Sequence, residues 1–315
     1  MLKAVEVLTI NTGHSEATRP ILVPGTEGPG LLVSITGMQP IIHGWDIATG
    51  ASLWSFTEEL PGVNDAVLAG LPDGRSILAV STEDGVERWS GITGAPLDGV
   101  DSSEWTIWGM DAGTFPGGRT VLLGAGHNHA VFRWDAISGE QLGAPLRGHE
   151  TSVRAVGLVG LSATDAVIVS GDDAGYLRRW DAITGDPIGV PVEGHGSLVS
   201  SISRLPAIDG RSLFASTDAE GEVSRWDAVT GERVGDPLKA GSDAHLLTTA
   251  CPGGIPLLLS AGPSSGIQAW HAWTGEAINL SLPGVSVAAL DQPDGTTLIA
   301  VGTSQGEIRL YSVSE

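Results

Sequence analysis

The sequence predicts an all-β fold, a seven-bladed β-propeller that spans residues 1–315 as a single domain. Three observations predict it. A tryptophan-centred segment recurs along the chain, short apolar runs alternate with turn residues, and 45 glycines and 18 prolines occur without a collagen period. A repeat of about 45 residues that holds four short strands is typical of a propeller blade.

The repeat is centred on one aromatic residue. The segments RWDAISG, RWDAITG and RWDAVTG are nearly identical, and GWDIATG, RWSGITG, AWHAWTG and LYSVSE are variants of them. Successive aromatic positions lie 41 to 46 residues apart. Each aromatic side chain is expected to fill the space between neighbouring blades. The seven anchors are Trp45, Trp89, Trp134, Trp180, Trp226, Trp270 and Tyr311.

The fourth repeat shows the expected strands most clearly. An apolar inner strand is predicted over 153–161, and the continuous apolar run 166–170 predicts a strand buried on both faces. Residues 172–175 form a turn, because Asp and Gly tolerate positive φ angles. A third strand follows over 176–181, and an outer strand is predicted through residue 192.

The two ends of the chain are predicted to pair. The chain stops at Glu315, just after a third strand, and it begins with the apolar segment Ala4 to Ile10. In other repeats an outer strand occupies the place of that segment. We therefore expect the N-terminal strand to complete the last blade, so that the ring has four antiparallel strands in each blade and two fewer open sheet edges.

Gly-His steps add a second, more specific signal. His14, His149 and His195 each follow glycine and precede Trp45, Trp180 and Trp226 by 31 residues. With the Trp-Asp steps, the whole chain resembles the WD-repeat family, in a bacterial, actinobacterial-looking form. The resemblance implies that His, Ser or Thr, Asp and Trp form a hydrogen-bonded chain within a blade. The structural residues that it points to are His14, Trp45, Trp89, Trp134, His149, Asp172, Trp180, His195, Asp218, Trp226 and Trp270.

The sequence departs from the family pattern at the acidic position. Where the family has Asp six residues before Trp, this chain has Gln39, Glu83, Asn128, Ala174, Glu220 and Ser264. Asp172 and Asp218 instead lie eight residues before their Trp. We expect them to reach the same His by a shorter route, and we expect no blade to contain the standard network.

Charge and cysteine content limit the function classes. The net charge is −21, with only 16 basic residues, which argues against a nucleic-acid partner. The acidity serves solubility or attracts a basic partner. The single Cys251 indicates no disulfide framework. The N-terminus is a poor signal peptide, and no apolar stretch is long enough to cross a bilayer. A cytoplasmic monomer without membrane contact is expected.

No motif predicts catalysis. The sequence lacks a nucleophile elbow, a phosphate loop, an H-E-x-x-H and a CxxC. His127 and His129 form a close pair in a turn of blade three, but two ligands are weak evidence for a metal. The acidic pairs fall in turns, where turn chemistry and solubility explain them. We expect no catalytic residues, no metal and no cofactor.

Blade three is the least regular repeat. Its segment 102–108 places Trp105 and Trp108 in what the repeat predicts to be an inner strand, where other blades have aliphatic residues. Either both indoles fill the core, or they form an aromatic anchor at a face of the ring, because tryptophan is enriched at interface hot spots.

These observations predict a non-enzymatic scaffold that binds a protein or peptide on one face. In WD-repeat proteins, partners often dock where the inner strands begin. The alternative is an enzyme or small-molecule binder that uses the central channel, with Glu104, Trp105 and His127 near its site, and a third reading is a stand-alone ligand sensor. The predicted partner-binding residues are Glu104, Trp105, Thr106, Ser152, Arg154, Leu198, Ser200, Leu246 and Thr248.

Overall fold

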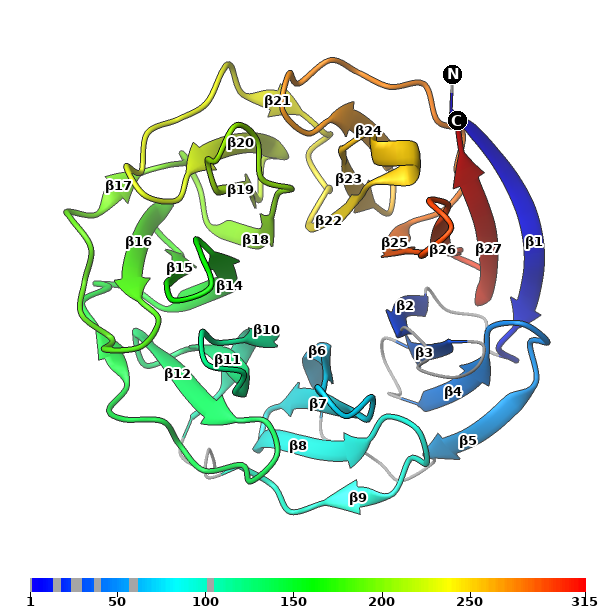
Figure 1. Cartoon of the computed structure of the whole chain (residues 1–315), viewed down its shortest axis with the longest axis horizontal. Helices are drawn as coiled ribbons and strands as arrows, with labels where there is room; N and C mark the ends of the chain where they lie inside the picture. The colour runs from blue at the N-terminus through cyan, green and yellow to red at the C-terminus, as the bar shows by residue number, and fades with distance from the viewer. Residues whose placement is uncertain (1, 14–17, 24–29, 37–40, 57–61, 101–104) are drawn as a thin grey trace.

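The computed structural model describes residues 2–13, 18–23, 30–36, 41–56, 62–100 and 105–315. Within these residues the strands form seven antiparallel sheets, arranged as blades around a central axis (Figure 1). The predicted seven-bladed propeller is therefore confirmed. In the same residues, no helix is long and apolar enough to cross a membrane.

The blades follow one another in chain order. Blade one has β2 (Thr18–Val23), β3 (Leu31–Thr36), β4 (Ile42–Asp46) and β5 (Ser52–Phe56); blade two has β6 (Val63–Gly70), β7 (Ser76–Thr82), β8 (Gly85–Ser90) and β9 (Pro96–Leu97). Blade three has β10 (Ile107–Thr114), β11 (Thr120–Gly126), β12 (Ala130–Asp135) and β13 (Leu146–Arg147); blade four has β14 (Val153–Gly160), β15 (Ala166–Asp172), β16 (Tyr176–Asp181) and β17 (Val192–Glu193). Blade five has β18 (Val199–Arg204), β19 (Leu213–Asp218), β20 (Glu222–Asp227) and β21 (Leu238–Lys239); blade six has β22 (Leu246–Ala250), the short 3-10 helix η1 (Pro252–Gly254), β23 (Leu257–Gly262) and β24 (Gly266–His271). Blade seven has β25 (Ser286–Asp291), β26 (Thr297–Gly302), β27 (Glu307–Ser314) and β1 (Lys3–Asn11).

The N-terminal strand closes the ring, as the sequence predicts. β1 pairs with β27 over eight positions and forms the outer strand of blade seven. The two termini consequently lie side by side at the rim (Figure 1). Ile10 is buried against Trp45 and Leu310, so β1 also joins blade seven to blade one.

The outer strands are shorter than predicted. In blade four the expected strand through residue 192 is reduced to β17, and a single bridge joins Trp180 to Pro187. Proline explains the difference, because it cannot donate to a strand ladder and Pro187 and Pro191 interrupt this segment. In blade six the described residues form only three strands, followed by one bridge between Trp270 and Ala277.

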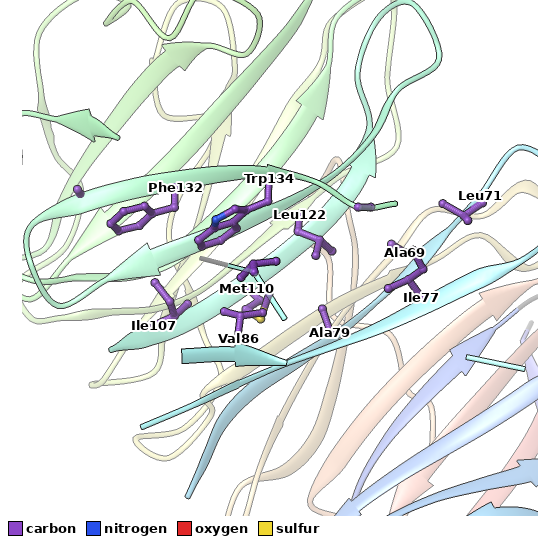
Figure 2. Packing of buried hydrophobic residues seen from close by; sticks show 13 residues of the cluster. Ala69, Leu71, Ile77, Ala79, Val86, Ile107, Met110, Leu122, Phe132 and Trp134 are labelled. Carbon is purple, nitrogen blue, oxygen red and sulfur yellow. The ribbon is translucent and has the colours of Figure 1, made fainter. Parts of the chain in front are cut away.

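The core is divided among the blade interfaces. The described residues form seven clusters of buried apolar side chains, and each cluster draws on two adjacent blades. Figure 2 shows the cluster between blades two and three, where Trp134 packs with Phe132 of its own blade and Ala79 of the preceding one. Every aromatic anchor is buried at the interface with the preceding blade. The repeated tryptophan thus holds the ring together.

A buried arginine links each of four blades to the following one. Arg133 precedes the Trp of blade three and donates from Nη1 to the carbonyl oxygens of Ala182 and Ile183, at 3.1 and 3.3 Å. Those carbonyls belong to the Trp-Asp turn of blade four. A Cβ on Gly185 of that turn would lie 2.8 Å from the Arg133 guanidinium, which explains why the repeat has glycine there. Equivalent links are made by Arg88, Arg179 and Arg225.

Candidate functional site at the mouth of the central channel

A cavity of about 650 Å³ runs along the ring axis. All seven inner strands contribute to its wall: β2, β6, β10, β14, β18, β22 and β25. This volume lies within the range of small-molecule sites. The channel is therefore large enough for a ligand or for part of a partner.

In the part of the chain that the structure describes, four β-bulges shape one mouth of this channel. In blades two to five, the pairing of the inner strand with its neighbour skips one residue just after the strand begins. A bulge of this kind leaves its extra residue unpaired and can re-aim its side chain. All four skipped residues line the cavity, and we call them the bulge ring: Asn64, Trp108, Arg154 and Ser200.

The centre of the bulge ring is an aromatic and ionic cluster. The Arg154 guanidinium carbon lies 4.3 Å from the centroid of the Trp108 ring, a cation–π arrangement. Arg154 Nε donates to Asp173 Oδ1 at 2.5 Å, which fixes the guanidinium over the indole. The exposed His127 approaches Trp108 edge-on, with ring centroids 6.3 Å apart. Side chains from blades three and four thus meet at one point.

The carboxylates of the channel wall join blades. Asp65 on β6 forms an ion pair with Arg19 of blade one. Its Oδ2 accepts from the Met110 main-chain N–H of blade three at 2.7 Å. Asp111 on β10 accepts from the Leu158 N–H of blade four, also at 2.7 Å. These carboxylates are occupied by structural contacts rather than free for chemistry.

Asp111 is the most perturbed acid in the channel. Burial raises the pKa of its carboxyl to about 6, and the nearby Asp65 raises it further, whereas the Leu158 and Ala112 N–H groups and Arg204 oppose the shift. The cause is the cost of removing a charged carboxylate from water. The charge of the channel therefore changes near neutral pH.

The structure brings together some of the predicted partner-binding residues. Arg154, Ser200, Leu246 and Thr248 line the channel. Ser152 is buried, and its hydroxyl lies 3.1 Å from His127 Nδ1, so it helps to hold the His127 ring at the channel mouth. Thr106 and Leu198 are half-buried at the strand entrances, outside the cavity wall, and their carbonyls accept from the main-chain N–H groups of His127 and Ala219. Glu104 and His14 lie outside the described residues.

The two tryptophans of blade three have different environments. β10 begins at Ile107, so Trp105 precedes the inner strand instead of lying in it, which corrects the prediction. Trp105 packs against the core between blades two and three, 6.1 Å from the Phe132 ring. Trp108 faces the channel. Sequence reasoning missed Trp108 as the site residue, although its alignment with Asn64, Arg154 and Ser200 after equivalent strand starts is a usable signal.

Within the described residues, blades four and five contain a hydrogen-bonded His–Ser–Trp chain. In blade four, Trp180 Nε1 donates to Ser170 Oγ at 2.9 Å, and Ser170 Oγ lies 2.7 Å from His149 Nε2. His149 Nδ1 lies 2.8 Å from Asp172 Oδ2. Burial alone raises the pKa of Asp172, but the bonds from His149, Tyr176 and Ala174 outweigh it, so this pKa lies below its ordinary value. The expected shorter route from Asp172 to His149 is therefore confirmed, and Ala174 still stands where the standard network has its Asp.

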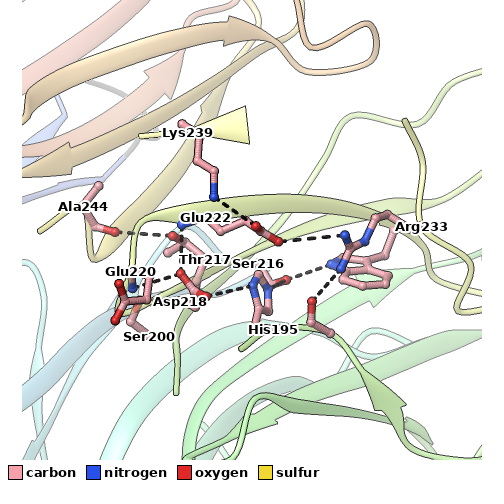
Figure 3. Close-up of polar contacts among 12 residues, drawn as sticks. His195, Ser200, Ser216, Thr217, Asp218, Glu220, Glu222, Arg233, Lys239 and Ala244 are labelled. Carbon is pink, nitrogen blue, oxygen red and sulfur yellow. Dashed lines mark hydrogen bonds and ion pairs between the residues drawn. The ribbon is translucent and has the colours of Figure 1, made fainter. Parts of the chain in front are cut away.

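Blade five repeats the arrangement (Figure 3). His195 Nε2 lies 2.6 Å from Ser216 Oγ, which accepts from Trp226 Nε1 at 2.8 Å. His195 Nδ1 is 3.6 Å from Asp218 Oδ2. Burial lowers the pKa of His195, against the opposing effect of Asp218 and Glu222, so the ring is neutral at pH 7. The serine ten residues before Trp is the element that the sequence analysis overlooked.

Ser170→Ala is expected to lower the free energy of unfolding by ~1–3 kcal/mol, because the Trp180 N–H and His149 Nε2 both lose their buried partner. Ser260 occupies the same position in blade six, and its buried Oγ has no hydrogen-bond partner among the described residues. Ser260→Ala is therefore the matched control, and it should leave the free energy of unfolding unchanged or raise it, because it removes an unpaired buried hydroxyl. Urea denaturation of both variants measures the difference, and equal effects would contradict the network's role.

The channel mouth presents cationic, aromatic and hydroxyl groups. Among the described residues, no three His, Cys, Asp or Glu side chains cluster as metal ligands. Ser152 and His127 are in contact, but Asp173 is bonded to Arg154 and orients neither of them. Burial and Asp291 raise the pKa of Cys251, which keeps that thiol protonated.

Comparison with known proteins supports the fold alone. No family model and no curated protein matches the sequence. A solved structure, the crystal structure of the computationally designed Ika8 protein, is similar over 98% of this chain and 99% of that chain, with 19% sequence identity and a TM-score of 0.66. At this identity the likeness extends to the β-propeller architecture and not to any binding partner.

Proposed function

We propose that this chain is a non-enzymatic interaction scaffold, a bacterial WD-repeat propeller that works as a cytoplasmic monomer and binds a protein or peptide at the bulge ring. One observation carries the proposal: consecutive bulges in blades two to five aim four different side chains into the same mouth. Bulges are often found beside functional sites, where they re-aim side chains. The His–Ser–Trp chains and the Gly-His and Trp-Asp steps support the WD-repeat assignment.

The chemistry of the mouth suits a peptide. Trp108 and Arg154 are residue types that dominate binding energy at interfaces. Their mutual stacking and the Asp173 bond hold both side chains in place before binding, so less side-chain entropy is lost on association. Leu246 and Thr248 add apolar and polar contact area across the channel. The net charge of −21 favours a partner with basic residues around this anchor.

The Arg154→Glu and Trp108→Ala variants are expected to lose a partner that wild type captures from native cell extract, as identified by quantitative mass spectrometry. The matched control is Ile183→Asp, which alters a 52% exposed residue in the turn after β16. That turn lies at the opposite end of blade four, because β16 runs parallel to β14 across β15.

The captured protein is then purified and titrated against each variant. Dissociation constants should rise at least about tenfold for the mouth variants, which corresponds to ~1.4 kcal/mol, and remain unchanged for Ile183→Asp. Equal loss in all three variants, or retention in all three, would place the interaction elsewhere on the molecule.

A further inference from the structure

The channel has the opposite charge balance to the chain. The sequence has 37 acidic and 16 basic residues. The cavity wall, however, holds three arginines and His245 but only two carboxylates among its described residues: Arg19, Arg154, Arg204, Asp65 and Asp111 are its charged groups. Low-dielectric walls of one sign attract ligands of the other sign. With Arg19 paired to Asp65 and Arg154 paired to Asp173, the channel is close to neutral, so it repels an anion far less than the rest of this acidic protein does.

The charged donors of this wall are less fully bonded than its carboxylates. Asp65 accepts from Arg19, Ala66 and Met110, and Asp111 accepts from Leu158, so both carboxylates are engaged. In the described part of the chain, by contrast, Arg154 is bonded through Nε only, and the Arg204 guanidinium has no hydrogen bond or ion pair.

Trp108 supplies an independent sign of a missing acceptor. Its Nε1 atom is buried, yet it has no hydrogen-bond partner among the described residues. An unpaired buried N–H costs about 1–3 kcal/mol, and this cost is relieved when an acceptor binds. The indole belongs to the cavity wall and is stacked against Arg154, so a small rotation that turns Nε1 toward the channel would let one anionic oxygen be bound by both groups.

We propose that the central channel binds a small anionic molecule through carboxylate or phosphate oxygens, with Trp108 and Arg154 at one mouth and Arg204 further along the wall. Planar guanidinium groups bind both oxygen types with charge-assisted hydrogen bonds. The cavity of about 650 Å³ accommodates a metabolite-sized ligand. This site shares Trp108 and Arg154 with the bulge ring and extends through Arg204 into the channel interior, and binding of the small anion needs no second chain.

Binding is expected to strengthen as the pH falls. Asp111 lies in the channel wall with a pKa of about 6, so lowering the pH from near 7.5 to near 5.5 removes one negative charge. The charged groups on the strands around it are Asp65 on β6, Arg154 on β14 and Arg204 on β18. Asp111→Asn should therefore bind an anion more tightly near pH 7.5 and show less pH dependence than wild type.

The test is isothermal titration of the purified full chain with sulfate and, separately, with tartrate. Both probes remain essentially ionised from about pH 5.5 to 7.5, and sodium chloride keeps the ionic strength constant. Wild type is expected to show saturable binding of at least one probe. Arg204→Gln and Trp108→Phe should each weaken it roughly tenfold, since a charge-assisted or buried hydrogen bond is lost. Preference for tartrate identifies the carboxylate class, and preference for sulfate identifies the phosphate class.

Arg75→Gln is the matched control, because Arg75 is 63% exposed in the turn between β6 and β7 and lies outside the cavity wall. Circular dichroism confirms that each variant is folded. Absence of saturable binding for both probes at both pH values, or binding unchanged by Arg204→Gln and Trp108→Phe, would overturn the proposal. The titration contains no partner protein, so neither result tests the scaffold proposal. That proposal is tested only by the capture experiment.

Discussion

Deletion of residues 1–11 is expected to abolish cooperative folding of the whole ring. The deletion removes β1 and leaves β27 as an open sheet edge, although Ile308 and Leu310 on β27 are fully buried in the intact protein. Ile10 is lost from the cluster that contains Trp45, so the interface between blades seven and one opens.

The size of this effect follows from the contacts of β1. Eight paired positions contribute roughly 5 kcal/mol of backbone hydrogen bonding at about 0.5–1 kcal/mol each. Burial of Leu8 and Ile10 adds ~2 kcal/mol apiece. The total, on the order of 10 kcal/mol, is comparable to the entire free energy of unfolding of a typical protein.

Thermal unfolding followed by circular dichroism measures the loss. A synthetic peptide of residues 1–12, added to the truncated chain, should restore a cooperative transition, because it can pair with β27 again. The control peptide carries Leu8→Lys and Ile10→Lys, which keep the backbone but cannot enter the cluster. A truncated chain that unfolds cooperatively within about 1 kcal/mol of the intact one would show that β1 does not close the ring.

The repeat period was sufficient to predict the ring, because spacing survives variation at individual positions. Tyr311 replaces Trp and Trp270 is followed by His271, yet both residues stay in register with the other anchors. Ring closure was predictable for the same reason. The last repeat has no outer strand of its own, and the N-terminal segment is a strand that belongs to no other repeat. The length of the outer strands was less predictable, because the prolines allow only two residues to pair in blade four.

The candidate site was only partly predictable, because a β-bulge is a property of two paired strands. The sequence places Arg154 near a strand start, but only the pairing Val153 with Asp172 and Ala155 with Gly171 shows that Arg154 is skipped. The same shift in blade three makes Trp108 the channel residue instead of Trp105. Asp111 gives no sequence signal, since its raised pKa depends on burial by other blades.

The buried arginines were visible in the sequence as the residue before Trp, but their role depends on geometry between blades. Arg88 donates to the carbonyls of Ala136, Ile137 and Ser138 in blade three and to Asp98 in its own blade. Blade one has Gly44 at the equivalent position, and a Cβ there would lie 2.2 Å from the Trp54 ring. Trp54 Nε1 instead donates to Ile92 of the next turn at 3.0 Å. An indole thus replaces the guanidinium where the repeat lacks arginine.

Arg88→Met is therefore expected to destabilise the fold by ~3–5 kcal/mol. Methionine fills a similar volume but donates no hydrogen bond, so the buried carbonyl of Ala136 and the part-buried carbonyl of Asp98 lose their partner. Burial lowers the pKa of the Arg88 guanidinium, yet carbonyl dipoles from two blades stabilise its positive charge. Arg88→Lys should recover only part of the loss, because one ammonium group cannot span both blades.

Arg119→Met provides the matched control for this substitution. Arg119 is 59% exposed and meets Asp135 at 3.5 Å, so its ion pair is screened by solvent and should contribute less than about 1 kcal/mol. Guanidinium chloride denaturation of the three variants tests the comparison. If Arg88→Met and Arg119→Met shift the transition midpoint equally, the arginines do not join the blades. If only Arg88→Met loses stability, each Arg-Trp pair joins its blade to both neighbours. The tryptophan packs on the preceding blade, and the arginine is bonded to the following one.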